Sequence, residues 1–372
     1  MKIGFITTYF YPVLGGAETN CFHLARELAK KNEVHIFTSN NNTSPKEETL
    51  DKIHIHRSKT LFRSGYYAAF YPSLLKNLLH YDLDIVHVHS YGFLWHDLCV
   101  LLKKFTSPHT KFVITPHGPF MTLPSYPLWK KIFKLFVYTL EYFPNTLYDL
   151  VFQVNPTQIN WLPHYGFKKK NIRFLPNGIP SSFLKKDKTL PEFHDKFLIT
   201  YIGRVQRYKG LAQVIQILPE LISFNKKILF VIAGDPQDMQ ALVKQARQLK
   251  VGQHLLFLGK ITEEEKKSLL QTTSVFVFPS KWEAFGISML EAMAKGCAVI
   301  STNTEGGKFL IEEAKNGYLF TFGDITTLKE KLLLLTHKKL LSSLSKNNKK
   351  KAALFTWEKI TQDLQHYYEM IS

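Results

Sequence analysis

The chain has 372 residues, enough for two ordinary domains, and its 45% hydrophobic content excludes a disordered protein. Its formal net charge of +18 favours phosphate-bearing partners: nucleic acid, an anionic membrane or a phosphorylated small molecule. The three scattered cysteines, Cys21, Cys99 and Cys297, include no CxxC pair, so buried thiols are expected and neither a disulfide framework nor a zinc site is indicated.

The first half of the chain alternates short apolar runs with amphipathic segments, which predicts parallel strands covered by helices. Helices are expected at Ala17–Lys31 and Trp95–Lys104, and the polar stretch Asn40–Thr49 is expected to be a mobile loop. The strands expected in chain order are Lys2–Thr8, Val34–Thr38, a segment containing Ile53 and Ile55, Asp84–His89, Lys111–Pro116, Val151–Val154 and Ile172–Leu175.

The pattern restarts after Pro176–Pro191, where Pro, Gly, Ser and Lys cluster, and this predicts a domain boundary. Helices are expected at Leu211–Ile222, Asp238–Lys250 and Thr356–Ile371. The expected strands are Phe197–Ile202, Ile228–Ala233, Leu255–Leu258, Val275–Phe278, Ala298–Ser301 and Tyr318–Phe320. Two such series predict an α/β protein of two doubly wound, Rossmann-like domains, 1–178 and 192–350, followed by a terminal helix, 355–372.

Two glycine turns follow expected strands and precede expected helices. At Gly15 and Gly16 a ligand could approach the backbone and an anion could meet helix N–H groups, but a simple tight turn explains them equally well. Gly203 and Arg204, with Lys209 beyond them, take the same place in the second half. Two cations beside a helix N-terminus, which is already partly positive, favour a phosphate ligand.

The segment 283–291 follows the fourth strand of the second half. Gly286 is expected to start a helix, which leaves Glu283 in the preceding loop and Glu291 two turns further in. Carboxylates accept hydrogen bonds from sugar hydroxyls. Three backbone N–H groups at this helix start could receive phosphate: those of Phe285, Gly286 and Ile287. In the alternative reading, Glu283 only favours the helix dipole and Glu291 is an exposed helix residue.

His117 directly follows the fifth strand, a placement that suits a catalytic histidine, although a lone histidine is more often structural. The pairs His54/His56 and His87/His89 each share one strand face. No third ligand is evident beside either pair, so no metal site is predicted.

Taken in order, the motifs GGAE, HG, GRxxxxKG and Glu–seven residues–Glu resemble the retaining GT-B glycosyltransferases of family 4, also called group 1. The resemblance covers nearly the whole chain, with supporting pieces at DIVHVHS, PNGI, AGD, FLGKI, TNTEGG, NGYLF and FTWEKI. It implies a GT-B fold, in which two Rossmann-like domains face a central cleft and the terminal helix crosses back to the first domain.

The resemblance also implies roles for the donor-binding residues. Arg204 and Lys209 would grip the donor diphosphate and stabilise it as a leaving group, while the turn at Gly16 would close over it. Glu283 would hold hydroxyls of the donor sugar, with the N–H groups of 285–287 nearby. Fixed cations and N–H groups aimed at the growing charge would lower the barrier without a metal or other cofactor.

Three further parts of the site follow from the resemblance. Glu291 would hold the ribose hydroxyls, and His117 would assist at the reacting sugar through its backbone carbonyl or its ring. The base would be bordered by the turn that contains Gly259, Lys260 and Ile261.

The implied activity is retaining transfer of a sugar from a nucleoside-diphosphate sugar to a sugar or lipid-linked acceptor, in glycolipid, polysaccharide or cell-envelope glycan synthesis. The alternative is a GT-B-fold epimerase or another sugar-nucleotide enzyme that needs no acceptor. Nucleic-acid binding is not expected, because no DNA- or RNA-binding motif accompanies the positive charge.

Two segments of the first domain, Arg57–Lys76 and Phe120–Tyr142, are rich in both basic and aromatic residues. They predict reversible docking on an anionic membrane, on its inner face, by a protein that is otherwise cytoplasmic and has no spanning segment. In the alternative reading, the aromatic residues are the core faces of two helices, and the lysines extend past them to water.

Overall fold

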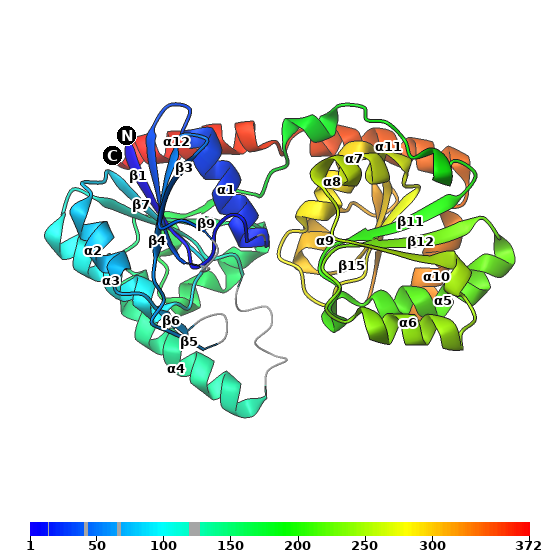
Figure 1. Ribbon diagram of the computed structural model, residues 1–372, viewed down its shortest axis with the longest axis horizontal. Helices are drawn as coiled ribbons and strands as arrows, with labels where there is room; N and C mark the ends of the chain where they lie inside the picture. The colour runs from blue at the N-terminus through cyan, green and yellow to red at the C-terminus, as the bar shows by residue number, and fades with distance from the viewer. Residues whose placement is uncertain (14, 41–43, 65–67, 119–126) are drawn as a thin grey trace. The chain divides into compact units, whose positions relative to one another are not determined.

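The computed structural model describes residues 1–13, 15–40, 44–64, 68–118 and 127–372. The chain divides into two compact units: unit 1, which is Met1–Asn177 with Trp357–Ser372, and unit 2, which is Gly178–Thr356. In each unit, helices cover both faces of a twisted sheet (Figure 1). Most of the predicted boundary segment, from Gly178 onward, therefore belongs to unit 2.

The unit 1 sheet has the strand order β10-β9-β8-β7-β1-β2-β4-β3, and every described pair is parallel except β3 with β4. Six of the seven parallel strands were predicted to within two residues, because strands buried on both faces read as continuous apolar runs. The seventh, β4, contains the predicted Ile53 and Ile55. The strands are β1 (Lys2–Ile6), β2 (Glu33–Ser39), β3 (Glu47–Leu50), β4 (Ile53–Ser58), β7 (Ile85–His89), β8 (Lys111–Thr115), β9 (Leu150–Gln153) and β10 (Ile172–Phe174).

Two regions of unit 1 differ from the prediction. The end of the expected loop Asn40–Thr49 is strand β3, whose Glu48 pairs with Arg57 at 2.7 Å. A polar edge strand has no apolar run to reveal it. The segment Arg57–Lys76, considered as a helix, instead contains a two-stranded ribbon of β5 (Phe62–Ser64) and β6 (Ala68–Phe70) before α2 begins.

The helices of unit 1 pack on opposite faces of the sheet. Strand β7 shows the division, because its side chains alternate: Val86 and Val88 join the core formed with α2, α3 and α4, whereas His87 bonds Tyr368 of α12. Helices α12 and α1 pack together, with His23 stacked on Trp357. The helices are α1 (Gly16–Leu28), α2 (Ser73–His80), α3 (Leu94–Thr106), α4 (Leu128–Asn145) and α12 (Trp357–Ile371).

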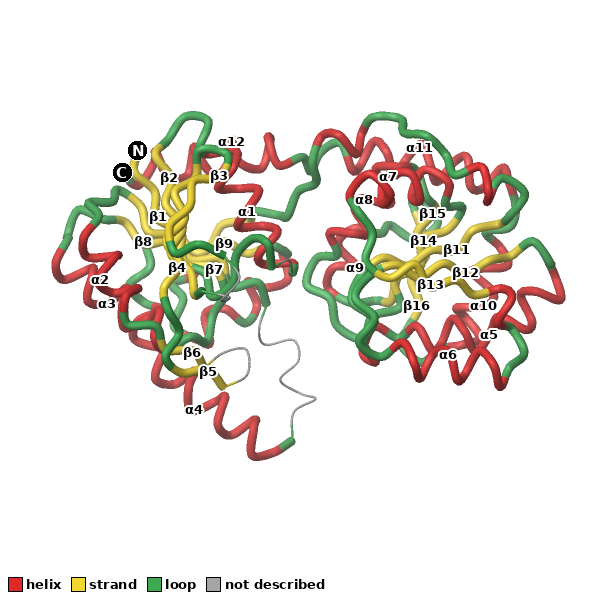
Figure 2. Tube along the Cα trace, viewed as in Figure 1, coloured by secondary structure: helices red, strands yellow, loops and turns green. Residues whose placement is uncertain are grey.

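The unit 2 sheet is parallel throughout its described pairs, with the order β13-β12-β11-β14-β15-β16. Figure 2 shows these strands in yellow, with helices on either side of them. Each strand lies within one residue of its prediction. The strands are β11 (Phe197–Ile202), β12 (Ile228–Ala233), β13 (Leu255–Gly259), β14 (Val275–Phe278), β15 (Ala298–Thr302) and β16 (Gly317–Phe320).

Seven helices of unit 2 connect or flank these strands within the described chain. The first residues of some of these helices form capping motifs that are visible in the sequence. At α7, for example, the Thr262 side chain and Glu265 form a capping box. The helices are α5 (Leu211–Phe224), α6 (Met239–Gln248), α7 (Glu263–Thr272), α8 (Ile287–Lys295), α9 (Glu305–Leu310), α10 (Ile325–Leu334) and α11 (Lys338–Ala352). Among the described residues, no helix combines the length and apolar composition that crossing a bilayer requires.

Candidate functional site

Each sheet has a point at which the chain reverses its direction of travel across the strands. In unit 2 the chain runs outward from β11 to β13 and then returns to continue from β14 to β16. In unit 1 the corresponding point lies between β1 and β7. The loops that leave the carboxyl ends of the strands diverge there, and ligands of open α/β sheets bind in the resulting crevice.

The two loops at the unit 2 reversal point carry the predicted catalytic residues Lys209 and Glu283. Lys209 ends a short turn after β11, and Glu283 lies in the loop after β14. The Lys209 Nζ donates to the Glu283 Oε2 at 3.0 Å, and both side chains are largely buried. Burial lowers the pKa of Lys209, but the combined effect of Glu283, Tyr201 and Tyr208 raises it by a larger amount. The pKa therefore lies above its usual value, and the ammonium stays charged.

The backbones of these two loops lie close together. The Lys281 N–H donates to the Tyr208 carbonyl at 2.8 Å. Gly210, at φ 70°, follows Lys209, and a Cβ there would lie 2.1 Å from the Pro279 carbonyl oxygen. Only glycine allows this approach, so GRxxxxKG ends in glycine because the second loop passes against it.

Arg204, the other predicted cation, differs from Lys209 in its surroundings. Its side chain is exposed, and its guanidinium has no ion pair or hydrogen bond with a described residue. Its carbonyl oxygen accepts a hydrogen bond from the Tyr201 hydroxyl, which fixes the backbone at this position. The guanidinium is therefore available for a planar, two-point contact with phosphate oxygens.

Helix α8 begins as predicted, with Gly286 as its N-cap at φ 91° and Ile287 as its first residue. Phe285 is buried against Phe309 and Phe355, which anchors the loop before the helix. The first N–H groups of α8 have no partner within the helix and suit an anion. Glu283 therefore lies at the mouth of this helix.

The reading of Glu291 as an exposed helix residue is wrong. Glu291 is buried on α8, and its Oε1 accepts a hydrogen bond from Lys266 of α7 at 2.8 Å. Burial raises the pKa of Glu291, and the Lys266 ammonium opposes that rise. Lys266 also pairs with Glu263 at 2.8 Å. The capping box locates α7 in the sequence. The contact between α7 and α8, which brings Lys266 to Glu291, is seen only in the tertiary structure.

The predicted base-binding turn follows β13 at the same edge of the sheet. Gly259 has φ 68°, and a Cβ there would meet no atom within 4 Å, so the turn needs the backbone conformation of glycine and leaves open space beside it. Lys260 is exposed and lies 3.9 Å from Asp235, and Ile261 is half-buried. After β11, Gly203 packs against Gly234 so tightly that a Cβ on Gly234 would lie 2.0 Å from the Gly203 carbonyl oxygen.

In unit 1, the predicted glycines lie at the start of the first helix. Gly15 is the N-cap of α1 in an extended conformation, and Gly16 is its first residue, with open space where a Cβ would stand. Both follow β1 and so lie at the carboxyl edge of that strand, on one side of the unit 1 reversal point. The glycine turn thus occupies the position expected of a ligand-approach loop.

His117 belongs to a histidine network on the other side of that reversal point. Its Nε2 lies 3.1 Å from the Nδ1 of His89, the last residue of β7. Burial lowers the pKa of His117 to about 3 and that of His89 well below its usual value, so both rings are neutral at physiological pH. The backbone of His117 has φ 59°, an uncommon conformation that requires support from the surrounding structure. The neighbouring His87 bonds both Thr115 and Tyr368.

Within the described chain, no cluster of three or more His, Cys, Asp or Glu side chains could hold a metal ion. Asp82 and Asp84 form a DxD triplet, but Asp82 pairs with His109, and the Asp84 carboxylate accepts from the Lys2 N–H. Both lie before β7, at the amino ends of the strands and away from the reversal-point loops.

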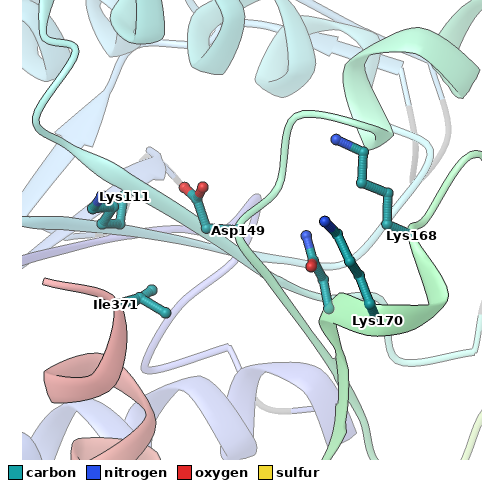
Figure 3. A pocket seen from close by; sticks show the side chains of 6 residues that line it. Lys111, Asp149, Lys168, Lys170 and Ile371 are labelled. Carbon is teal, nitrogen blue, oxygen red and sulfur yellow. The ribbon is translucent and has the colours of Figure 1, made fainter.

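A shallow pocket of about 380 Å³ in unit 1 is separate from these residues (Figure 3). Three of its lining side chains are Lys111, Lys168 and Lys170, and Figure 3 shows Asp149 between Lys111 and the other two, with Ile371 of α12 also in the lining. Lys111 begins β8, so this basic pocket lies at the amino edge of the sheet, opposite the edge that carries His117.

Comparison with known proteins agrees with this architecture. The model of the family "Glycosyltransferase Family 4" matches residues 14–183, and that of "Glycosyl transferases group 1" matches residues 182–351. The N-acetyl-alpha-D-glucosaminyl L-malate synthase of Bacillus anthracis is 27% identical over 352 residues, which cover 90% of this chain and 87% of that protein.

Two solved structures show the same fold. Sucrose-phosphate synthase from Thermosynechococcus elongatus superposes with a TM-score of 0.81 at 19% identity, covering 100% of this chain and 98% of the other. The Anabaena protein HepE, in complex with UDP-glucose, superposes with a TM-score of 0.78 at 16% identity over the whole of both chains. With two Rossmann-like units and two family models that together span residues 14–351, the chain belongs to the group 1, family 4 glycosyltransferases and has the GT-B fold.

Proposed function

We propose that this glycosyltransferase moves a sugar from a nucleoside-diphosphate sugar to a sugar or lipid-linked acceptor, with retention of anomeric configuration. The observation that carries the proposal is the pairing of Lys209 with Glu283 at the unit 2 reversal point. Beside this pair lie the N-terminus of α8 and Arg204, whose guanidinium has no partner among the described residues. HepE, a protein of the same fold, binds UDP-glucose, which supports a nucleotide-sugar donor.

In this proposal the diphosphate lies against the cationic side of the site. Arg204 and Lys209 hold its oxygens together with the N–H groups of residues 285–287, and they stabilise the negative charge that grows as the glycosidic bond breaks. Lys209 is held in place by Glu283 before any ligand arrives, so its charge is oriented in advance.

The remaining roles follow the same geometry. Glu283 accepts hydrogen bonds from hydroxyls of the donor sugar, and Glu291 accepts them from the ribose, in exchange for part of its contact with Lys266. The turn at Gly259, Lys260 and Ile261 borders the base. Because side-chain cations take the place of a divalent ion, no metal cofactor is needed.

We assign the acceptor to unit 1. His117 is neutral and hydrogen-bonded to His89, so its ring or its backbone carbonyl is proposed to assist at the reacting sugar without carrying a charge. The turn at Gly15 and Gly16 is proposed to approach the donor diphosphate through its backbone.

Calorimetry with free nucleoside diphosphates tests the donor site. We expect UDP, GDP or ADP to bind the wild-type protein, Glu291→Gln to weaken that binding roughly tenfold, and Glu283→Gln to affect turnover more than binding. The matched control is Glu220→Gln, which alters a surface carboxylate of α5 that pairs with Lys329 at 2.7 Å. Unchanged nucleotide affinity in a folded Glu291→Gln protein would show that the ribose assignment is wrong.

An assay with and without an acceptor distinguishes sugar transfer from the acceptor-independent alternative. Incubation with candidate nucleotide sugars should give a glycosylated product only when an acceptor is supplied. An altered sugar nucleotide formed without any acceptor would instead establish an epimerase or a related enzyme.

A further inference from the structure

The exposed surface of α4 is more apolar than its buried surface. Nine large apolar side chains of this helix, between Leu128 and Phe143, are at least 49% exposed. The buried stripe contains Lys134, Glu141 and Asn145 among its five residues. A helix of a water-soluble domain normally has the reverse arrangement.

Helix α3 shows the same inversion. Its exposed stripe is Leu94, Leu98, Leu102 and Phe105, spaced by about one helical turn, whereas its buried side includes His96, Asp97 and Lys103. The two helices pack against each other on the same side of the sheet. We call their exposed apolar side chains together the α3–α4 face. An apolar face of this extent marks a surface that binds something.

Buried polar contacts hold the inverted helices in this orientation. The Tyr148 hydroxyl contacts Asp97 of α3 at 3.5 Å, and the Asn145 amide of α4 donates to the Tyr165 carbonyl at 2.7 Å. Lys103 donates to the Tyr81 carbonyl at 2.8 Å. Rotating either helix to bury its apolar stripe would break these contacts, so the exposure of the α3–α4 face is built into unit 1.

Three basic residues of the two predicted segments are engaged within unit 1. Arg57 is buried and paired with Glu48, Arg63 bonds Ser39 and covers the Tyr9 ring, and Lys134 is buried. Trp129, Phe133 and Phe136 of α4 are exposed, so the reading of a core face is wrong for them. Tyr138 is buried in the core, as that reading expects. Tyr66, Tyr67, Phe120 and Tyr126, which belong to the two predicted segments, lie outside the described residues.

We propose that the α3–α4 face lies on an anionic lipid bilayer, with α3 and α4 in the interfacial plane and not across the membrane. Among the exposed side chains of α4, hydrogen-bonding groups belong only to Trp129, Lys130, Thr139 and Tyr142, and two of these four lie in its first turn. A protein partner would require a polar rim with many hydrogen bonds, whereas the acyl region of a bilayer requires none.

Charge favours the same occupant. Lys130 and Lys131 lie in the first turn of α4, at one end of the face. At the other end, Lys104 of α3 lies 3.7 Å from Asp149, a lining residue of the basic pocket that also holds Lys168 and Lys170. The net charge of +18 opposes contact between two copies of the chain and attracts an anionic surface. The proposal adds to the proposed function a place where a lipid-linked acceptor would meet unit 1.

Sedimentation with vesicles tests this docking. We expect the wild-type protein to bind vesicles of phosphatidylcholine and phosphatidylglycerol in equal parts, and to bind phosphatidylcholine vesicles and high-salt samples more weakly. Phe136→Glu and Leu98→Glu, one on each helix, should each weaken binding roughly tenfold or more. The matched control is Phe224→Glu in unit 2, since Phe224 is 63% exposed and Phe136 is 60% exposed.

A direct readout uses Trp129. Brominated lipids should quench the tryptophan fluorescence of the bound protein, and Trp129→Phe should remove most of that quenching while thermal unfolding is unchanged. Wild-type binding by both folded glutamate variants, or no sedimentation of the wild type at low salt, would overturn the proposal. A wild-type dimer that Phe136→Glu separates, with no vesicle binding, would identify the face as a protein interface instead.

These measurements need neither donor nor acceptor. Failure of vesicle binding would therefore leave the proposed sugar transfer standing, and failure of the transfer assay would leave the vesicle result standing.

Discussion

Helices α4 of unit 1 and α5 of unit 2 are both rich in large apolar residues, but they turn them in opposite directions. Helix α5 buries Val214, Ile217 and Leu218 against its sheet, whereas α4 buries Lys134 and Glu141 and exposes its apolar side chains. Both sequences have helical periodicity, so both predict helices. An apolar stripe in the sequence therefore identifies a helix face that becomes buried. It does not show whether that face is buried against the sheet of the same unit or against a binding partner.

The two units also place their charges differently. Unit 2 pairs Lys209 with Glu283 at its reversal point, where we propose the donor site. Unit 1 buries Asp97 on the inner side of α3 and Glu141 on the inner side of α4, and it leaves the outer surface of both helices apolar. The predictions below test this division between a proposed ligand site built on an ion pair and a proposed docking face with buried acids behind it.

The largest difference is expected from matched leucine substitutions in the two helices. Leu218→Ala in α5 should reduce the free energy of unfolding by about 2–5 kcal/mol, because Leu218 is fully buried and its loss leaves a cavity. Leu140→Ala in α4 should change it by less than about 0.5 kcal/mol, because half of that side chain is exposed. Denaturant unfolding without lipid measures both. Equal costs at the two positions would mean that α4 is covered within the protein.

The cationic residues of unit 2 should affect activity more than stability. Arg204→Ala and Lys209→Ala are each expected to raise the barrier to sugar transfer by about 2–4 kcal/mol, since each removes a contact to the developing diphosphate charge. Initial rates at saturating donor give this value, and circular dichroism confirms the fold. Arg247→Ala, on α6, serves as the control for loss of an arginine outside the proposed site. Wild-type rates in a folded Arg204→Ala protein would refute the assigned role.

The buried acids of unit 1 should make its stability depend on pH. Burial and the nearby Asp97 raise the pKa of Glu141 from 4.5 to about 10, so the folded state holds a proton that the unfolded chain releases. The folded pKa is the higher one, so this contribution is complete below the unfolded pKa and is lost as pH rises toward the folded pKa.

Glu141→Gln keeps the shape of the side chain and removes its titration. Between about pH 6 and about pH 9, the variant should therefore lose roughly 1–3 kcal/mol less stability than the wild type. Some pH dependence should remain, because burial also raises the pKa of Asp97, to about 7. Denaturant unfolding across this range tests the prediction, and parallel curves for the two proteins would contradict it.

The smallest effect is expected from metal removal. Because the proposed donor site uses side-chain cations, excess EDTA should leave the transfer rate unchanged within error. Complete loss in EDTA that magnesium or manganese restores would show that Arg204 and Lys209 do not replace a divalent ion.

Much of the fold could be predicted from the sequence, because parallel strands buried on both faces leave long apolar runs whatever their partners are. β7 and β14 were therefore located to within a residue. β3 was missed because a polar strand at an exposed edge resembles a loop, and the β5–β6 ribbon was missed because strands of three residues are too short to show a period. The start of α8 at Gly286 could be predicted, because the helix needs a residue that accepts φ 91° there.

Contacts between distant segments were decided only by the tertiary structure. The sequence identified Lys209, Glu283 and Glu291 through family motifs, but neither the 3.0 Å pair of Lys209 with Glu283 nor the partner of Glu291, Lys266, can be read from local spacing. The orientation of α4 was equally hidden. Local periodicity fixes which residues share a helix face, whereas the face that turns inward depends on the polar groups that α3 and the neighbouring loops already bury.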